Sequence, residues 1–92
     1  MFTKEQAKEI GDKLGVDWNQ FDLKEFHMGM DIELEHGIKY PKWNVTNDCP
    51  IKTAKIALAH LEEIQDYYTR LKRMEEEAGI KENVITSFLR GN

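Results

Sequence analysis

Apolar residues recur every three or four positions along most of the chain, which is the spacing of one face of an α-helix. In the first segment these positions are Ala7, Ile10 and Leu14. Thr3 and Gln6 precede them at the spacing of a capping box, in which each side chain pairs with a free backbone N–H of the first turn. Gly15 suits the left-handed residue that ends a helix. The pattern therefore predicts a first helix over residues 4–14.

A second helical pattern follows an apolar linker that contains Trp18 and Phe21. Asp22 and Glu25 repeat the capping-box spacing, and Gly37 is placed to end the helix. We therefore expect a helix over residues 23–36.

The connection after this helix is about a dozen residues long, which is unusual inside a compact domain. It contains Tyr40, Pro41 and Trp43. Such a loop is either packed by its aromatic residues or functional. Tyr40 and Trp43 are therefore a candidate interaction surface, with packing over the helix ends as the alternative.

The longest uninterrupted stretch runs from Cys49 to Glu77. Asp48 is a natural N-cap, and Pro50 is tolerated in a first turn because its missing N–H would be unpaired there. No glycine or further proline occurs before Gly79. Ten residues share one face at helical spacing: Thr53, Ile56, Ala57, His60, Ile64, Tyr67, Tyr68, Leu71, Met74 and Ala78. This pattern predicts one long helix over residues 49–77.

A short apolar segment after Gly79 predicts a fourth helix over residues 82–89. The fold class expected is all-α: a small bundle of three main helices (4–14, 23–36 and 49–77) plus the short C-terminal one. The second and third helices should form an antiparallel centre. With 92 residues, the chain is long enough for one domain, residues 1–92.

Charged residues interrupt the faces that should be buried. Placed at about 100° per residue, the second helix carries Glu33 and His36 in the middle of its wide apolar arc. The long helix carries His60 near the centre of its apolar face and Glu63 at the edge. Because each pair has a spacing of three, each can converge on one point, and antiparallel packing would bring the two pairs together.

Three interpretations of these four residues stay open. The first is a buried hydrogen-bonded network, since a buried carboxylate must be paired. The second is a metal site for zinc, iron or manganese, which imidazole and carboxylate ligands suit; a two-metal site would need two further glutamates. The third is acid–base catalysis by His60 and Glu33. No complete catalytic constellation is present, so an enzyme is the less favoured class.

Composition limits the class of protein and its expected cellular location. Hydrophobic residues make up 40% and charged residues 33% of the chain, which is typical of a folded protein. The formal charge of −4 gives no general attraction for nucleic acid or anionic membranes. No apolar run approaches the roughly 20 residues of a membrane span, and the first residues lack a signal-peptide pattern. The single cysteine, Cys49, also favours a reducing compartment, so we expect a cytoplasmic protein.

Three blocks resemble the signature of a family of small uncharacterised proteins of bacteriophages and bacteria, known only as a domain of unknown function. The blocks are ELEHG (33–37 with Ile32 before it), NVTND (44–48) and KIALAHLEE (55–63) followed by DYYTRL (66–71). The resemblance covers about residues 2–76. It implies a small phage-related or bacterial protein of the cytoplasm and brings no activity with it. The function we expect is that of an accessory protein acting by binding a protein partner or a second copy of itself, with a metal-binding bundle as the alternative.

Overall fold

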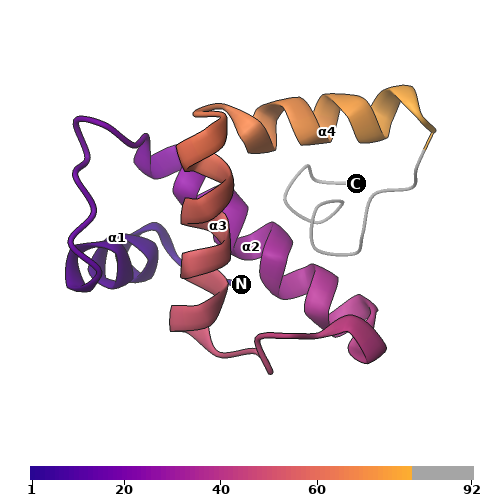
Figure 1. The fold of residues 1–92 in the computed structure, drawn as a ribbon, viewed down its shortest axis with the longest axis horizontal. Coiled ribbons are helices and arrows are strands. Elements are labelled where there is room, and N and C mark those ends of the chain that lie inside the picture. Colours follow the sequence, from indigo (N-terminus) through magenta and orange to yellow (C-terminus); the bar gives the residue numbers. More distant parts are fainter. Residues whose placement is uncertain (80–92) are drawn as a thin grey trace.

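The computed structural model describes residues 1–79, and every regular element within them is a helix (Figure 1). The elements are α1 (Lys4–Lys13), α2 (Leu23–Lys39), the short 3-10 helix η1 (Pro41–Trp43), α3 (Pro50–Glu63) and α4 (Tyr67–Glu77). The all-α class is therefore confirmed. The helix expected over residues 82–89 lies outside the described residues.

The first helix begins and ends by the signals in its sequence. The Thr3 hydroxyl accepts from the Gln6 N–H at 3.0 Å, and the Gln6 side chain accepts from the Thr3 N–H at 2.9 Å, so the capping box is complete. At the other end Gly15 has φ of +77°, and the Val16 N–H donates to the Gly11 carbonyl at 2.9 Å. This is a Schellman ending, and it places the last helical residue at Lys13, one residue before the expected end.

The second helix is longer than predicted, since Gly37 does not end it. A Cβ atom on Gly37 would lie 2.9 Å from the side chain of Asn44, so this glycine allows the following loop to pack against the helix. The start also differs in detail. Asp22 caps the helix by accepting from the Lys24 N–H at 2.8 Å, while Glu25 turns away toward α4.

The prediction of one helix over residues 49–77 is wrong. The chain leaves the helix at Ile64, which is extended with φ of −139° and ψ of 110°, and starts a new helix after Asp66. Figure 1 shows α4 turning sharply away from the end of α3. Local helix propensity does not explain this break, because residues 51–78 contain no glycine or proline. Contacts with α2 produce it, as described below.

The core lies mainly between α2 and α3, which run in opposite directions and cross (Figure 1). Its buried apolar residues are Ala7, Phe21, Phe26, Met30, Ile32, Ala54, Ala57, Leu61 and Tyr68. The N-terminal segment is attached to α2 by two polar side chains. The Phe2 N–H donates to Asp31 Oδ1 at 3.0 Å, and the Phe2 carbonyl lies 2.7 Å from His27 Nε2. Burial raises the pKa of the Asp31 carboxyl.

Candidate functional site

One face of α2 receives the start of α4. Glu25, Gly29 and Glu33 are spaced four residues apart, so they lie one above another on that face. Tyr68 from α4 packs across the middle of the row, and His60 from α3 lies beside one end of it. We call Glu25, Gly29, Glu33, His60 and Tyr68 the polar junction.

Glu25 caps the N-terminus of α4 from another helix. Its Oε1 accepts from the backbone N–H groups of Tyr68 at 3.1 Å and Thr69 at 3.2 Å, and its Oε2 accepts from the Thr69 hydroxyl. The first N–H groups of a helix have no partner inside the helix, and a carboxylate there is favoured by the helix dipole. Asp66, the residue at the cap position, makes no side-chain cap bond. The carboxylate of Glu25 therefore takes the place of a local cap.

Gly29 makes room for the ring of Tyr68. A Cβ atom on Gly29 would lie within 2.9 Å of three atoms of that ring, which is closer than packed atoms approach. The Tyr68 side chain is fully buried as a result. A larger residue at position 29 would push α4 away from α2.

Glu33 completes the junction. Its Oε2 accepts from the Tyr68 hydroxyl at 2.7 Å and lies 3.6 Å from His60 Nε2. The His60 ring stacks on Tyr67, with centroids 4.3 Å apart and planes 9° apart, and meets the edge of Tyr68 at 6.0 Å. Burial, together with the neighbouring Glu33 charge, raises the pKa of Tyr68, so its hydroxyl keeps its proton and acts as a donor.

The structure brings together two of the four residues singled out from the sequence. Glu33 and His60 are neighbours. His36 is half-buried and its ring faces Tyr40 with centroids 6.5 Å apart, while Glu63 is exposed at the end of α3. Within residues 1–79, no group of three or more histidine, cysteine, aspartate or glutamate residues is arranged to hold a metal ion. The metal site stays a prediction without geometric support in this part of the chain.

The chemistry of the junction is that of a structural network. Each of its carboxylates accepts from groups of α4, and these bonds fix the helix that contains Tyr68. Sequence reasoning missed Glu25, because its capping-box spacing to Asp22 explained it locally. The signal that could have revealed it is the row of Glu25, Gly29 and Glu33 at intervals of four.

The last turn of α2 and the segment that follows it present apolar side chains to solvent. Ile38 is 54%, Tyr40 50%, Trp43 70% and Val45 79% exposed. We call these four residues the aromatic loop surface. Two lysines lie over its rings: the Lys39 ammonium is 5.5 Å from the Tyr40 centroid, and the Lys42 ammonium is 5.0 Å from the Trp43 centroid. Packing of Tyr40 and Trp43 over the helix ends, the alternative expected from the sequence, would require these rings to be buried, and they are exposed.

Asn44 holds this loop in one conformation. Its Oδ1 accepts from the Thr46 N–H, the Thr46 hydroxyl and the Asn47 N–H, and its Nδ2 donates to Asp48 Oδ1 at 2.8 Å. Thr46 is buried, and Asn47 and Asp48 have positive φ of 52° and 62°. Since the Asn44 side chain also packs on Gly37, the loop is fixed to α2. The aromatic loop surface is therefore exposed but preorganised.

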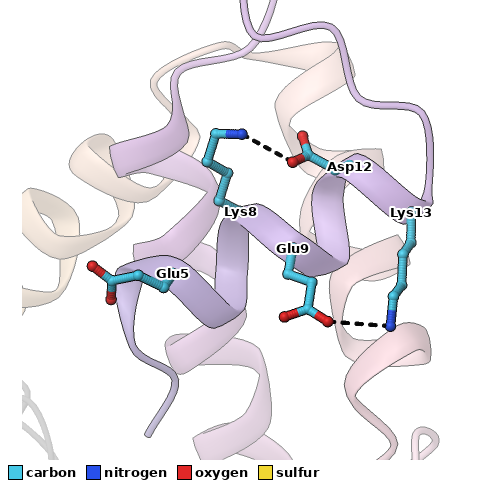
Figure 2. A pocket seen from close by; sticks show the side chains of 5 residues that line it. All are labelled: Glu5, Lys8, Glu9, Asp12 and Lys13. Carbon is cyan, nitrogen blue, oxygen red and sulfur yellow. Dashed lines mark hydrogen bonds and ion pairs between the residues drawn. The ribbon is translucent and has the colours of Figure 1, made fainter.

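A shallow hollow on the outer side of α1 is lined by five charged residues, four of which form two ion pairs. Figure 2 shows its five lining residues, Glu5, Lys8, Glu9, Asp12 and Lys13. Lys8 Nζ lies 2.9 Å from Asp12 Oδ2, and Lys13 Nζ lies 3.4 Å from Glu9 Oε1. The Trp18 indole N–H also donates to Asp12 at 2.7 Å. This bond and the one from Lys8 lower the pKa of the Asp12 carboxyl. Neutralised surface pairs of this kind do not define a ligand site.

Comparison with known proteins assigns the chain to a family. A family model described as a protein of unknown function (DUF5661) matches residues 7–77, so the chain belongs to that family. No curated protein and no solved structure matches the chain. Among the helices of residues 1–79, none has the length and apolar character needed to cross a membrane. The matched segment includes both the polar junction and the aromatic loop surface.

Proposed function

We propose that this protein is a small accessory protein that binds a partner protein through the aromatic loop surface. The segment it recognises on the partner is acidic and carries an aromatic or large aliphatic side chain. The family resemblance supports the cytoplasm of a bacterium or of a phage-infected host as its setting. The polar junction gives no comparable support for a metal-binding or catalytic role, because its groups bind one another.

The observation that carries the proposal is the exposure of Trp43 and Tyr40 on a loop that is held rigid. Scattered apolar residues on a surface need no explanation, but Ile38, Tyr40, Trp43 and Val45 fall within eight consecutive residues. Tryptophan and tyrosine are enriched among the residues that dominate binding energies. A preorganised loop also loses little conformational entropy on binding.

Charge indicates the chemistry of the partner. The chain as a whole has a formal charge of −4, yet residues 37–47 contain two lysines and no acidic residue. Lys39 and Lys42 are exposed beside the two rings. Carboxylates that flank an apolar side chain would meet these ammonium groups while the side chain contacts Trp43. A basic partner would find no such pairing on this surface.

The test is a fluorescence-anisotropy titration with a labelled peptide of about a dozen residues. The peptide carries one tryptophan and one leucine among glutamates and aspartates, and a matched peptide replaces the acids with lysine. We expect the acidic peptide to bind and the lysine peptide not to bind. Trp43→Ala should weaken binding at least about tenfold, as expected for a dominant contact. Lys42→Glu should also weaken binding of the acidic peptide. Its effect should be larger at low salt concentration, where the repulsion between the introduced carboxylate and the peptide carboxylates is less screened.

Two matched variants serve as controls. Met74→Ala removes an exposed apolar side chain from α4, and Lys13→Glu reverses a charge on α1, which lies far from the loop in Figure 1. Both should bind as the wild type does. Equal affinity for the two peptides, equal loss of binding in the controls, or preferential binding of an oligonucleotide would each overturn the proposal.

A further inference from the structure

The break between α3 and α4 is imposed from outside the segment in which it occurs. Residues 51–78 contain no glycine or proline, and their apolar face continues through the break. Neither Ile64 nor Asp66 has a positive φ. The local sequence is therefore compatible with both a broken and a continuous helix.

In the broken form, α2 supplies acceptors that a continuous helix would supply itself. The N–H groups of Tyr68 and Thr69 donate to Glu25. In a continuous helix the same groups would donate to the carbonyls four residues earlier, at Ile64 and Gln65. The Tyr67 N–H donates to the Ile64 carbonyl at 3.0 Å, which closes a turn over residues 64–67. The two forms therefore satisfy the same donors with different partners.

The deepest contact of α4 with the rest of the molecule is made by Tyr68, and Tyr67 and Leu71 pack partly buried beside it. Tyr68 is the one fully buried residue of α4 in the described structure, and its ring and hydroxyl fit the row formed by Gly29 and Glu33. Farther along the helix, Arg70, Arg73 and Met74 are exposed. Every group that receives Tyr68 belongs to α2 or α3, so an identical receptor exists on any second copy of the chain.

We propose that α4 exchanges between two copies of this chain. Residues 64–66 become helical, α3 and α4 form one continuous helix, and Tyr68 of each copy docks against Gly29 of the other. The exchanged dimer repeats the docking of Tyr68 on Gly29 and its bond to Glu33, while the N–H groups of Tyr68 and Thr69 change from Glu25 to carbonyls of their own helix. It also gains helical hydrogen bonds at the hinge, residues 64–66. Exchange of an identical element is a common route to symmetric dimers. The aromatic loop surface is not part of this interface, so the proposal is independent of the proposed function.

Two variants of the hinge should shift the equilibrium between the monomer and the exchanged dimer in opposite directions. In Ile64→Ala/Asp66→Ala, two residues of lower helix propensity are replaced by alanine. Asp66 makes no side-chain cap bond, and its exposed ion pair with Arg70 is removed from the monomer and the dimer alike. The dimerisation constant should rise about tenfold or more, because each dimer contains two hinges. Gln65→Pro places proline at the second position of the turn, where it is favoured, and prevents a continuous helix. This variant should remain a folded monomer at every concentration.

Complementation between two variants tests the exchange itself. A Tyr68→Ala chain keeps an intact receptor but has no ring to dock, and a Gly29→Ala chain keeps the ring but has a blocked receptor. Mixed, unfolded in urea and refolded together, the two chains should form a heterodimer in which one junction is restored. Native mass spectrometry with one chain isotopically labelled measures this species, and Gln65→Pro in the Gly29→Ala chain should abolish it. Monomers alone, both for the hinge-alanine variant at millimolar concentration and for the mixture, would overturn the proposal.

Discussion

Replacing Gly29 with alanine tests the polar junction through the sign of its effect on stability. Gly29 lies inside α2, where alanine stabilises an ordinary helix by about 1 kcal/mol. If Tyr68 did not pack on this position, the variant would be more stable than the wild type. The structure predicts the opposite, because the added Cβ atom would lie within 2.9 Å of three ring atoms, whereas ordinary contacts are 3.4–4 Å.

The magnitude follows from what the ring loses when it is displaced. Exposing a buried large side chain costs about 1.5–3 kcal/mol, and loss of the hydrogen bonds between α4 and the two carboxylates costs about 1.5–3 kcal/mol more. After the gain of about 1 kcal/mol in helix propensity, Gly29→Ala should lower the free energy of unfolding by about 2–5 kcal/mol. This is a large part of the total stability expected for a small domain.

The assay is urea unfolding followed by far-ultraviolet circular dichroism, with Tyr68→Ala as the second variant of a double-mutant cycle. In the Tyr68→Ala background the space above position 29 is empty, so Gly29→Ala should become neutral or stabilising. A stabilising effect of Gly29→Ala in the wild-type background would refute the packing of Tyr68 on α2. An equal loss in both backgrounds would show that the cost arises elsewhere.

Three further predictions use the same unfolding measurement. Tyr68→Phe removes the hydroxyl that donates to Glu33 and should cost about 1.5–3 kcal/mol; Tyr67→Phe, whose hydroxyl has no hydrogen bond within residues 1–79, should cost almost nothing, and similar losses would contradict the role of Glu33. Burial raises the pKa of the Glu35 carboxyl in the folded protein above its ordinary value. The protonated carboxyl therefore contributes its full stability below the ordinary pKa, and this contribution is lost as the pH rises through the raised pKa. Glu35→Gln should therefore be more stable than the wild type at pH 7, and the difference should disappear below about pH 4; a difference that grows toward acid would be inconsistent with the raised pKa. Asn44→Ala should cost about 1–3 kcal/mol because it leaves loop N–H groups without an acceptor, and it should also weaken peptide binding; unchanged peptide affinity would argue against preorganisation of the loop.

The predictable part of the fold is the part that local signals determine. The capping box at Thr3 and the left-handed Gly15 fix the ends of α1 within one residue. The helical pattern also identified α2, although its end was misplaced. Gly37 falsely indicates a helix end, because a glycine that allows close packing by a later residue has the same local signature as one that ends a helix.

The break after α3 depends on residues about 40 positions away and has no local signal. The pattern of residues 49–77 was that of one helix, and Glu25, Gly29 and Tyr68 together override it. The candidate site was predicted in part for the same reason. Burial on helical faces correctly paired Glu33 with His60, whereas the positions of His36 and Glu63 depended on a crossing of α2 and α3 that periodicity does not specify.

The binding role is tested most directly by mapping the acidic peptide onto the protein by NMR. Chemical-shift changes in a titration of the isotopically labelled protein report which residues the peptide contacts. The account predicts changes concentrated at Ile38, Lys39, Tyr40, Lys42, Trp43 and Val45, with the indole N–H of Trp43 shifting and that of Trp18 unchanged. Changes centred on α1 or on the polar junction, or no saturable change at all, would contradict it.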